Sequence, residues 1–292
     1  MIHLSIGGLV IALEADGAFP LEVTGATRRF VVEEPAAIDC RIRARWGAVE
    51  PAPGPPRFDS GGVWKVYDEG DGLRFDFHSA TFGTIPYKSA RFDAGFQRGE
   101  VTFHSPYFQP DQPLYPLEYP LDEILATQLL GRTGGIELHA AGIVDTDGEG
   151  WLFAAQSGGG KTTMSRLWLA AGGAVLSDDR IIVRESGGSI RMFGTPWHGE
   201  AELSVASSAP LRGIFLLHHG SENRCVRVVA PTSLAELLTR AFPPLWDRSS
   251  VDAALAFLDR LTEAVPVLDL WFHPDQETVA FLRECSAEVS RR

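Results

Sequence analysis

One segment with a strong structural signature spans residues 151–179 and reads WLFAAQSGGGKTTMSRLWLAAGGAVLSDD. Its apolar start, 151–155, predicts a strand. After the glycines, residues 161–171 predict a helix that stops at the next Gly-Gly pair. The apolar residues 174–176 predict a second strand, which runs into two aspartates. Strand, glycine loop, helix and strand in this order indicate an α/β fold.

The glycine loop has the form of a phosphate-binding P-loop, the Walker A motif. Its glycines allow backbone N–H groups to converge on phosphate oxygens, and the helix N-terminus adds a favourable dipole. Lys161, on what we expect to be a solvent-facing loop, supplies a compact positive charge, and the Thr162 hydroxyl is a ligand for Mg²⁺. Ala155 stands where the motif has its first glycine, and a glycine-rich turn before an ordinary helix is the alternative. The predicted nucleotide-binding residues are Ser157, Gly158, Gly159, Gly160, Lys161, Thr162 and Thr163.

Lysine is rare in this chain, so the position of each lysine is informative. Only Lys65, Lys88 and Lys161 are present among 26 basic residues. A chain that uses arginine for general positive charge has a lysine at the one position where the P-loop requires it. The scarcity therefore favours nucleotide phosphate binding over a chance match.

The aspartate pair Asp178-Asp179 follows the second strand, at a distance from Lys161 that a helix and a tight turn can span. Both carboxylates are therefore expected near the mouth of the P-loop. One of them can hold Mg²⁺ and the other can accept a proton from a hydroxyl. We assign Asp178 to the metal and Asp179 to the proton, and sequence alone leaves the two roles exchangeable. A solvated turn is the alternative.

Histidines and glutamates elsewhere supply further candidates. His139 ends the predicted strand 136–139, near the P-loop strand, although an isolated histidine there is more often structural. The segment 194–200, GTPWHGE, carries His198 and Glu200 in a loop that could close over a site. Glu200 and Glu202 offer further carboxylates to a metal, and a plain turn is the alternative. His218 and His219 are adjacent on a predicted strand, point to opposite faces and so exclude one shared metal site.

Proline usage divides the chain near residue 120. Five prolines fall within 106–120, and none of them suits a helix interior or a central strand. We therefore expect an N-terminal antiparallel β domain over 1–120, without a convincing helix, and a P-loop domain over 121–292. Further elements expected in the second domain are a helix 121–130 ending at Gly131, strands 136–139 and 142–145, a hairpin turning at 187–188, a hairpin joining 214–217 to 226–229, a helix opened by the capping box Ser233/Glu236, a helix 251–263, a strand 265–272 and a last helix through Leu282.

Composition excludes several classes of protein. The chain has 292 residues, 45% of them hydrophobic, and a formal charge of −12. It is therefore expected to fold, and its negative charge disfavours nucleic acid or an anionic membrane as the main partner. No apolar run approaches the roughly 20 residues of a membrane span, and no signal peptide is evident. Three widely spaced cysteines exclude a disulfide framework and fit a cytoplasmic location.

The order of Leu138-His139, the glycine loop 157–162 and Asp178-Asp179 resembles the HPr kinase/phosphorylase family, whose catalytic domain is related to that of phosphoenolpyruvate carboxykinase. The resemblance implies a P-loop serine kinase in which His139 and Asp179 assist phosphoryl transfer. Segment 194–200 looks like that of HPr-kinase-related proteins of peptide-modification pathways, including lasso-peptide kinases. In those proteins the acceptor is a peptide serine.

These observations favour a kinase that uses Mg²⁺ and ATP, or another nucleoside triphosphate, to phosphorylate a serine of a peptide or small protein. Its catalytic residues would be Asp179, His139 and Lys161, and the β domain would recognise the acceptor. A kinase for a small-molecule alcohol and a non-catalytic nucleotide sensor or scaffold are the alternatives. The oligomeric state stays open, a homo-oligomer included. The candidate metal ligands are Thr162, Asp178 and Glu200, and the arginines that could stabilise the transferred phosphoryl group are Arg224, Arg240 and Arg248.

Overall fold

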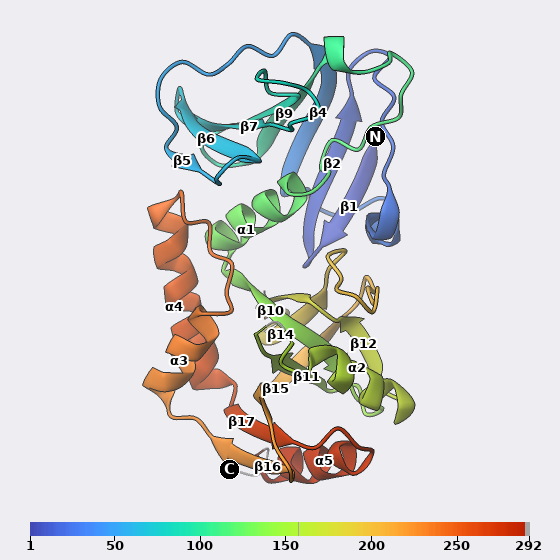
Figure 1. The fold of residues 1–292 in the computed structure, drawn as a ribbon, viewed down its shortest axis with the longest axis vertical. Helices are drawn as coiled ribbons and strands as arrows, with labels where there is room; N and C mark the ends of the chain where they lie inside the picture. Colours follow the sequence, from blue (N-terminus) through green and yellow to red (C-terminus); the bar gives the residue numbers. More distant parts are fainter. Residues whose placement is uncertain (157, 290–292) are drawn as a thin grey trace. The chain divides into compact units, whose positions relative to one another are not determined.

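A computed structural model describes residues 1–156 and 158–289 and divides into two units (Figure 1). The first comprises Met1–Ser5 and Leu9–Leu125, and the second comprises Ile6–Gly8 and the chain from Ala126 onward. The sequence placed the division at residue 120, whereas the contacts place it inside helix α1, Leu121–Thr133.

The first unit is built on a nine-stranded sheet with the strand order β3-β1-β2-β4-β9-β8-β7-β6-β5. Its apolar core lies on the inner face and is rich in phenylalanine, including Phe75, Phe77 and Phe103. The elements are β1 (Ile2–Ile6), β2 (Leu9–Ala15), the 3₁₀ helix η1 (Gly25–Phe30), β3 (Val31–Val32), β4 (Cys40–Gly47), β5 (Phe58–Asp59), β6 (Trp64–Glu69), β7 (Gly72–Phe77), β8 (Lys88–Phe92), β9 (Arg98–His104) and the 3₁₀ helix η2 (Ser105–Tyr107).

The prediction of an antiparallel sheet was wrong in one respect, because β4 runs parallel to both of its neighbours, β2 and β9. The strands from β5 to β9 lie next to one another in the order of the sequence and pair antiparallel, as expected. The chain reaches β4 from β2 through a long connection that contains η1. Parallel neighbouring strands need a long connection, because the chain has to return to the same end of the sheet. The hydrophobic pattern of the strands does not indicate whether they pair parallel or antiparallel.

The second unit is a mixed α/β structure with helices on both faces of its sheet. The strand order is β11-β10-β13-β14-β15-β17-β16, with β12 beside β10 and β11 also paired to β15. On one face, α2 and α5 contribute Met164, Trp168 and Leu282 to a shared core. On the other face, α3 and α4 contribute Leu237 and Phe257. The elements are β10 (Gly135–Val144), β11 (Gly150–Ala154), α2 (Lys161–Ala170), β12 (Ala174–Ser177), β13 (Arg180–Ser186), β14 (Ser189–Gly194), β15 (Ser208–His219), β16 (Arg224–Arg227), α3 (Ala230–Leu238), α4 (Arg248–Ala264), β17 (Val267–Phe272) and α5 (Glu277–Val289).

Parallel pairing aligns the strand ends that carry the site. β11 runs parallel to β15, and β15 runs parallel to β17, so their carboxyl ends lie at one edge of the sheet. The glycine loop leaves this edge from β11. In open α/β sheets, ligands bind at the carboxyl ends of the strands.

Two predicted strand arrangements in this unit were wrong. The segments 136–139 and 142–145 form one strand, β10, whose pairing shifts register between Gly142 and Ile143. The segments 214–217 and 226–229 were expected to form a hairpin, but β17 lies between β15 and β16. Only tertiary structure shows that a later strand inserts between two earlier ones.

Two helix boundaries also differ from the prediction. Gly131 does not end α1, which continues to Thr133 and is followed by Gly134 with a positive φ of 79°. A Cβ at Gly131 would lie 2.5 Å from the Ser250 Cβ, so this glycine permits close packing of α1 on α4. Helix α3 begins at Ala230 after Val229, which places Ser233 inside the helix rather than at its cap.

Candidate active site

The glycine loop joins β11 to α2 in a conformation that requires glycine at two positions. Gly158 and Gly160 have φ values of 77° and 100°, which side-chain-bearing residues rarely adopt. A Cβ at Gly160 would also lie 2.7 Å from the Phe272 ring, and one at Gly159 would lie 2.7 Å from the Ala155 Cβ. Helix α2 starts directly at Lys161, so its N-terminal amides face the loop. Such an arrangement favours anions. Ser157 lies outside the described residues.

The alanine at position 155 is compatible with this conformation, because Ala155 is not among the described residues with positive φ. Its side chain is buried, and its carbonyl oxygen accepts a hydrogen bond of 3.3 Å from Lys161 Nζ. The departure from the P-loop template therefore requires no unusual backbone geometry.

A pocket of about 410 Å³ lies over the loop and brings most of the predicted site residues together. It falls within the usual size range of small-molecule sites. Thr162 and Thr163 line it from the first turn of α2, and Glu200 lines it from the segment 195–202. The full lining is His139, Gly158, Gly159, Gly160, Lys161, Thr162, Thr163, Asp178, Asp179, Gly199 and Glu200.

Lys161, His139 and Asp179 form a chain of contacts at the centre of this pocket. Lys161 Nζ lies 2.9 Å from His139 Nε2, and the same ring nitrogen lies 3.0 Å from Asp179 Oδ1. One ring nitrogen either accepts from the ammonium or donates to the carboxylate, so the two hydrogen bonds exclude each other. Whether His139 Nε2 carries a proton therefore depends on whether the Lys161 ammonium donates to it.

The surroundings shift the pKa values of two of these groups. Burial lowers the pKa of the amine of Lys161, a residue that is 8% exposed, and the Asp179 carboxylate opposes this effect. The expected solvent-facing position of this lysine was wrong, because its amine lies in contact with the His139 ring and the Ala155 carbonyl oxygen. The hydrogen bond from His139 lowers the pKa of Asp179, with the nearby Arg180 acting in the same direction. Asp179 is thus held as a carboxylate.

Asp178 is next to Asp179 in the sequence, but its side chain contacts the segment 195–202. Its side chain is 2% exposed, and its two oxygens accept hydrogen bonds from Gly199 N at 2.9 Å and Ala201 N at 3.0 Å. Asp178 therefore fastens the segment 195–202 beside the pocket. Its role as a metal ligand stays a prediction, as does that of Glu200. Within the described part of the chain, no three His, Cys, Asp or Glu side chains gather into a metal site.

Further hydrogen bonds join the segment 195–202 to the end of β12 and the start of β13. Thr195 Oγ1 donates to Arg180 O at 2.7 Å, and Ser177 Oγ donates to Trp197 O at 3.2 Å. These hydrogen bonds, with those to Asp178, hold the segment beside the pocket. His198 and Glu202 in it are exposed and do not line the pocket.

Two charged residues next to this cluster, Arg180 and Glu137, were not among the predicted site residues. Arg180 Nη1 donates to Asp179 Oδ2 at 2.7 Å, and Arg180 Nε lies 3.3 Å from the buried Glu137 carboxylate. His139 stands directly opposite Arg180 in the β10–β13 pairing. Glu137 and His139 alternate on one strand and so share a face. That spacing was visible in the sequence, whereas the pairing with Arg180 was not.

Of the three arginine candidates, only Arg240 borders the site: its carbonyl oxygen accepts a hydrogen bond of 2.7 Å from His139 N, and its charge contributes to the lowered pKa of Lys161. Arg240 is buried and pairs with Glu236, Arg224 lies over the Trp271 ring, and Arg248 is 95% exposed. None of the three lines the pocket. His218 Nε2 lies 2.6 Å from Asp269 Oδ1.

Comparison with known proteins adds little. No protein-family model and no curated protein matches the chain. Among solved structures, it is similar to the HPr(Ser) kinase/phosphatase from Coxiella burnetii, with 11% identity and a TM-score of 0.33, over 53% of this chain and 98% of that one. At this TM-score the likeness assigns neither a fold family nor an activity. None of the described helices is long and apolar enough to cross a membrane.

Proposed function

We propose that the chain transfers the γ-phosphoryl group of ATP, or of another nucleoside triphosphate, to a serine hydroxyl of a peptide or small protein. One observation carries the proposal: a glycine loop suited to phosphate and a histidine–aspartate pair suited to a hydroxyl line the same pocket as Lys161. Phosphoryl transfer depends mainly on positioning and charge neutralisation, which these groups can supply.

The phosphate side of the pocket fits a triphosphate. The loop amides and the start of α2 would bind phosphate oxygens, and Lys161 would lie between the β- and γ-phosphates. Thr162, Asp178 and Glu200 line the pocket, and in this proposal they would hold Mg²⁺. The ion, when bound, would neutralise charge that develops on the phosphate oxygens.

The hydroxyl side would be served by Asp179 and His139. When the Lys161 ammonium turns to the phosphate, His139 Nε2 is free to donate to Asp179 and hold that carboxylate in place. Asp179 would take the serine proton as the serine oxygen bonds to phosphorus and the bond to the nucleoside diphosphate breaks. Arg180, bound to the other Asp179 oxygen, fixes the carboxylate from its far side.

The test is transfer of labelled γ-phosphate by the full chain, with Mg²⁺, to serine peptides and to small alcohols. Asp179→Asn should retain nucleotide binding while transfer falls by roughly 10²–10⁴-fold, the usual contribution of a positioned base. Asp275→Asn, which also removes one carboxylate from the second unit, should leave the rate unchanged. Transfer only to small alcohols would contradict the peptide acceptor. Equal transfer by the parent and Asp179→Asn would contradict the catalytic assignment.

A further inference from the structure

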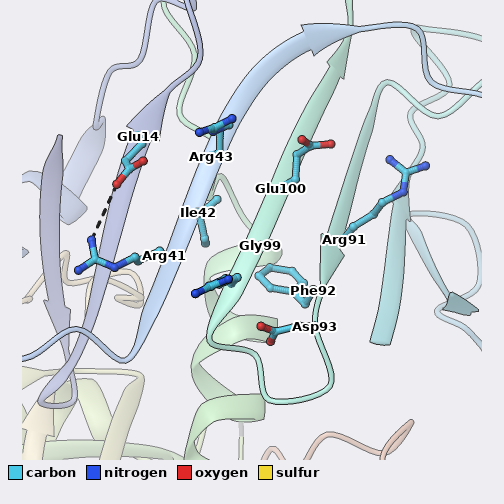
Figure 2. A pocket seen from close by; sticks show the side chains of 10 residues that line it. Glu14, Arg41, Ile42, Arg43, Arg91, Phe92, Asp93, Gly99 and Glu100 are labelled. Carbon is cyan, nitrogen blue, oxygen red and sulfur yellow. Dashed lines mark ion pairs between the residues drawn. The ribbon is translucent and has the colours of Figure 1, made fainter. Parts of the chain in front are cut away.

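The outward face of the first unit's sheet carries an unusual concentration of arginine. Strands β2, β4, β9 and β8 lie side by side there and line an open pocket of about 700 Å³ (Figure 2). None of its residues belongs to the candidate active site. The lining residues are Glu14, Arg41, Ile42, Arg43, Arg91, Phe92, Asp93, Arg98, Gly99 and Glu100.

The strand register arranges these charges in two different rows. In the first row, Arg43 stands between Glu14 and Glu100, and Glu100 in turn faces Arg91, so the signs alternate across four strands (Figure 2). The second row places Arg41 directly opposite Arg98. Like charges directly opposite on adjacent strands are destabilising. An anion bound between Arg41 and Arg98 would offset this repulsion, and the strand register places no carboxylate between them.

Two arginines of this face take part in no ion pair with the described residues, although Glu14 and Glu100 flank one of them, Arg43, in the strand register. Arg91 binds Glu69 at 2.9 Å, and Glu100 is bound by Arg45 at 2.9 Å. The contact of Arg41 with Glu14 is long, at 3.8 Å.

Arg43 and Arg98 have no ion pair to any residue that the structure describes. Both side chains are exposed on one face of the sheet, in a chain whose net charge is −12.

We propose that this face docks an extended acidic peptide segment, with one carboxylate between Arg41 and Arg98 and another over Arg43. Arg41 and Arg43 alternate on β4, so they project on the same face about 7 Å apart, which is also the spacing of alternate side chains in an extended peptide. Arginine suits this task because its planar guanidinium binds carboxylates in a bidentate manner. This inference extends the proposed function, because it makes the acceptor an acidic peptide. The role of the peptide as acceptor rests on the proposed kinase function, whereas its binding to this face does not.

A peptide fits this face better than a nucleic acid does. Glu14, Asp93 and Glu100 lie among the arginines and would repel a phosphate backbone, whose charge is uniform. A peptide can place carboxylates over the arginines and neutral or basic side chains over the glutamates. The negative charge of the whole chain acts against a polyanion as well.

The test measures binding of fluorescent peptides to the full chain at low salt. One twelve-residue peptide carries glutamate at alternate positions, and its partner carries glutamine there. The variant Arg43→Gln/Arg98→Glu removes the charge of Arg43, without adding a third carboxylate between Glu14 and Glu100, and reverses the charge of Arg98. Arg248→Glu, at an exposed position at the start of α4, reverses one charge elsewhere. Arg98→Glu also removes the like-charge pair with Arg41, so this exposed position should tolerate the change, and thermal unfolding verifies it.

The acidic peptide should bind the parent and the Arg248→Glu protein alike, and the double variant at least about tenfold more weakly, as expected when close charge pairs are lost. The glutamine peptide should bind none of them well. Equal binding of the acidic peptide to the parent and double variant would overturn the proposal. Tighter binding of a twelve-nucleotide single-stranded oligonucleotide would overturn it in favour of nucleic acid.

Nucleotide binding, measured by calorimetry on the same proteins, separates this proposal from the proposed function. The double variant should bind ATP as the parent does. If the parent bound the acidic peptide through these arginines but bound no nucleotide, the kinase function would fail and the docking face would stand.

Discussion

Asp178→Asn tests whether Asp178 acts as the anchor of the segment 195–202. Each Asp178 oxygen accepts one backbone N–H, from Gly199 and from Ala201. An asparagine keeps one acceptor oxygen but turns an NH₂ group toward the second N–H. Hydrogen bonds to a charged acceptor contribute about 1.5–3 kcal/mol, and an unsatisfied buried donor costs a comparable amount. We therefore expect local opening of the segment to become easier by roughly 2–4 kcal/mol.

Amide hydrogen exchange at Gly199 and Ala201 measures this opening directly. A change of that size should speed exchange at these two amides by roughly 30- to 1,000-fold, since 1.4 kcal/mol corresponds to a factor of ten. Asp269→Asn, which removes a carboxylate bound to His218 instead, should leave both amides protected. Unchanged protection in Asp178→Asn would refute the anchoring role. If in addition the Mg²⁺ requirement for phosphoryl transfer rose, Asp178 would act as the metal ligand that the sequence predicted.

Three further predictions concern stability and reactivity. Gly160→Ala should destabilise the protein by about 1–3 kcal/mol more than Gly148→Ala in urea unfolding, because both glycines have positive φ but only Gly160 has a neighbour, Phe272, within contact of an added Cβ. Asp247→Ala should cost about 1–2 kcal/mol at neutral pH, because Asp247 caps α4. Burial raises the pKa of Asp247, but hydrogen bonds lower it to about 2 overall, so the capping contribution is present above pH 4 and the difference between the two proteins should shrink as the pH falls toward 2 in acid unfolding. Burial raises the pKa of Cys40 to about 12, so iodoacetamide at pH 8 should label this thiol only after unfolding, as mass spectrometry would show.

The parts of the site that depend on local sequence could be predicted. Glycine, lysine and threonine at fixed spacing after a strand set the loop and the start of α2, because short-range backbone sterics and capping determine them. The structure places Lys161, His139 and Asp179 in one pocket, as the motif order suggested. Their catalytic roles stay predictions.

The parts that depend on strand pairing could not be predicted. Arg180 meets Asp179 and Glu137 only because β13 pairs with β10, and the anchoring of segment 195–202 by Asp178 depends on the path of a loop. The same limit explains the insertion of β17 between β15 and β16 and the parallel β4 of the first unit. Hydrophobic periodicity identifies strands but does not indicate which strands pair with each other.

Nucleotide binding by Lys161→Met tests the central claim most directly. Methionine keeps the apolar stem of a side chain that is largely buried, so the fold should survive, and thermal unfolding would verify this. Calorimetry with ATP and Mg²⁺ should show binding weakened by about 2–5 kcal/mol, or roughly 30- to 5,000-fold, the usual cost of truncating one partner of a close charge pair. Lys65→Met, whose lysine pairs with Asp59 in the first unit, should bind ATP as the parent does. Equal affinity of the parent and Lys161→Met for ATP would contradict phosphate binding at the glycine loop and, with it, the proposed phosphoryl transfer.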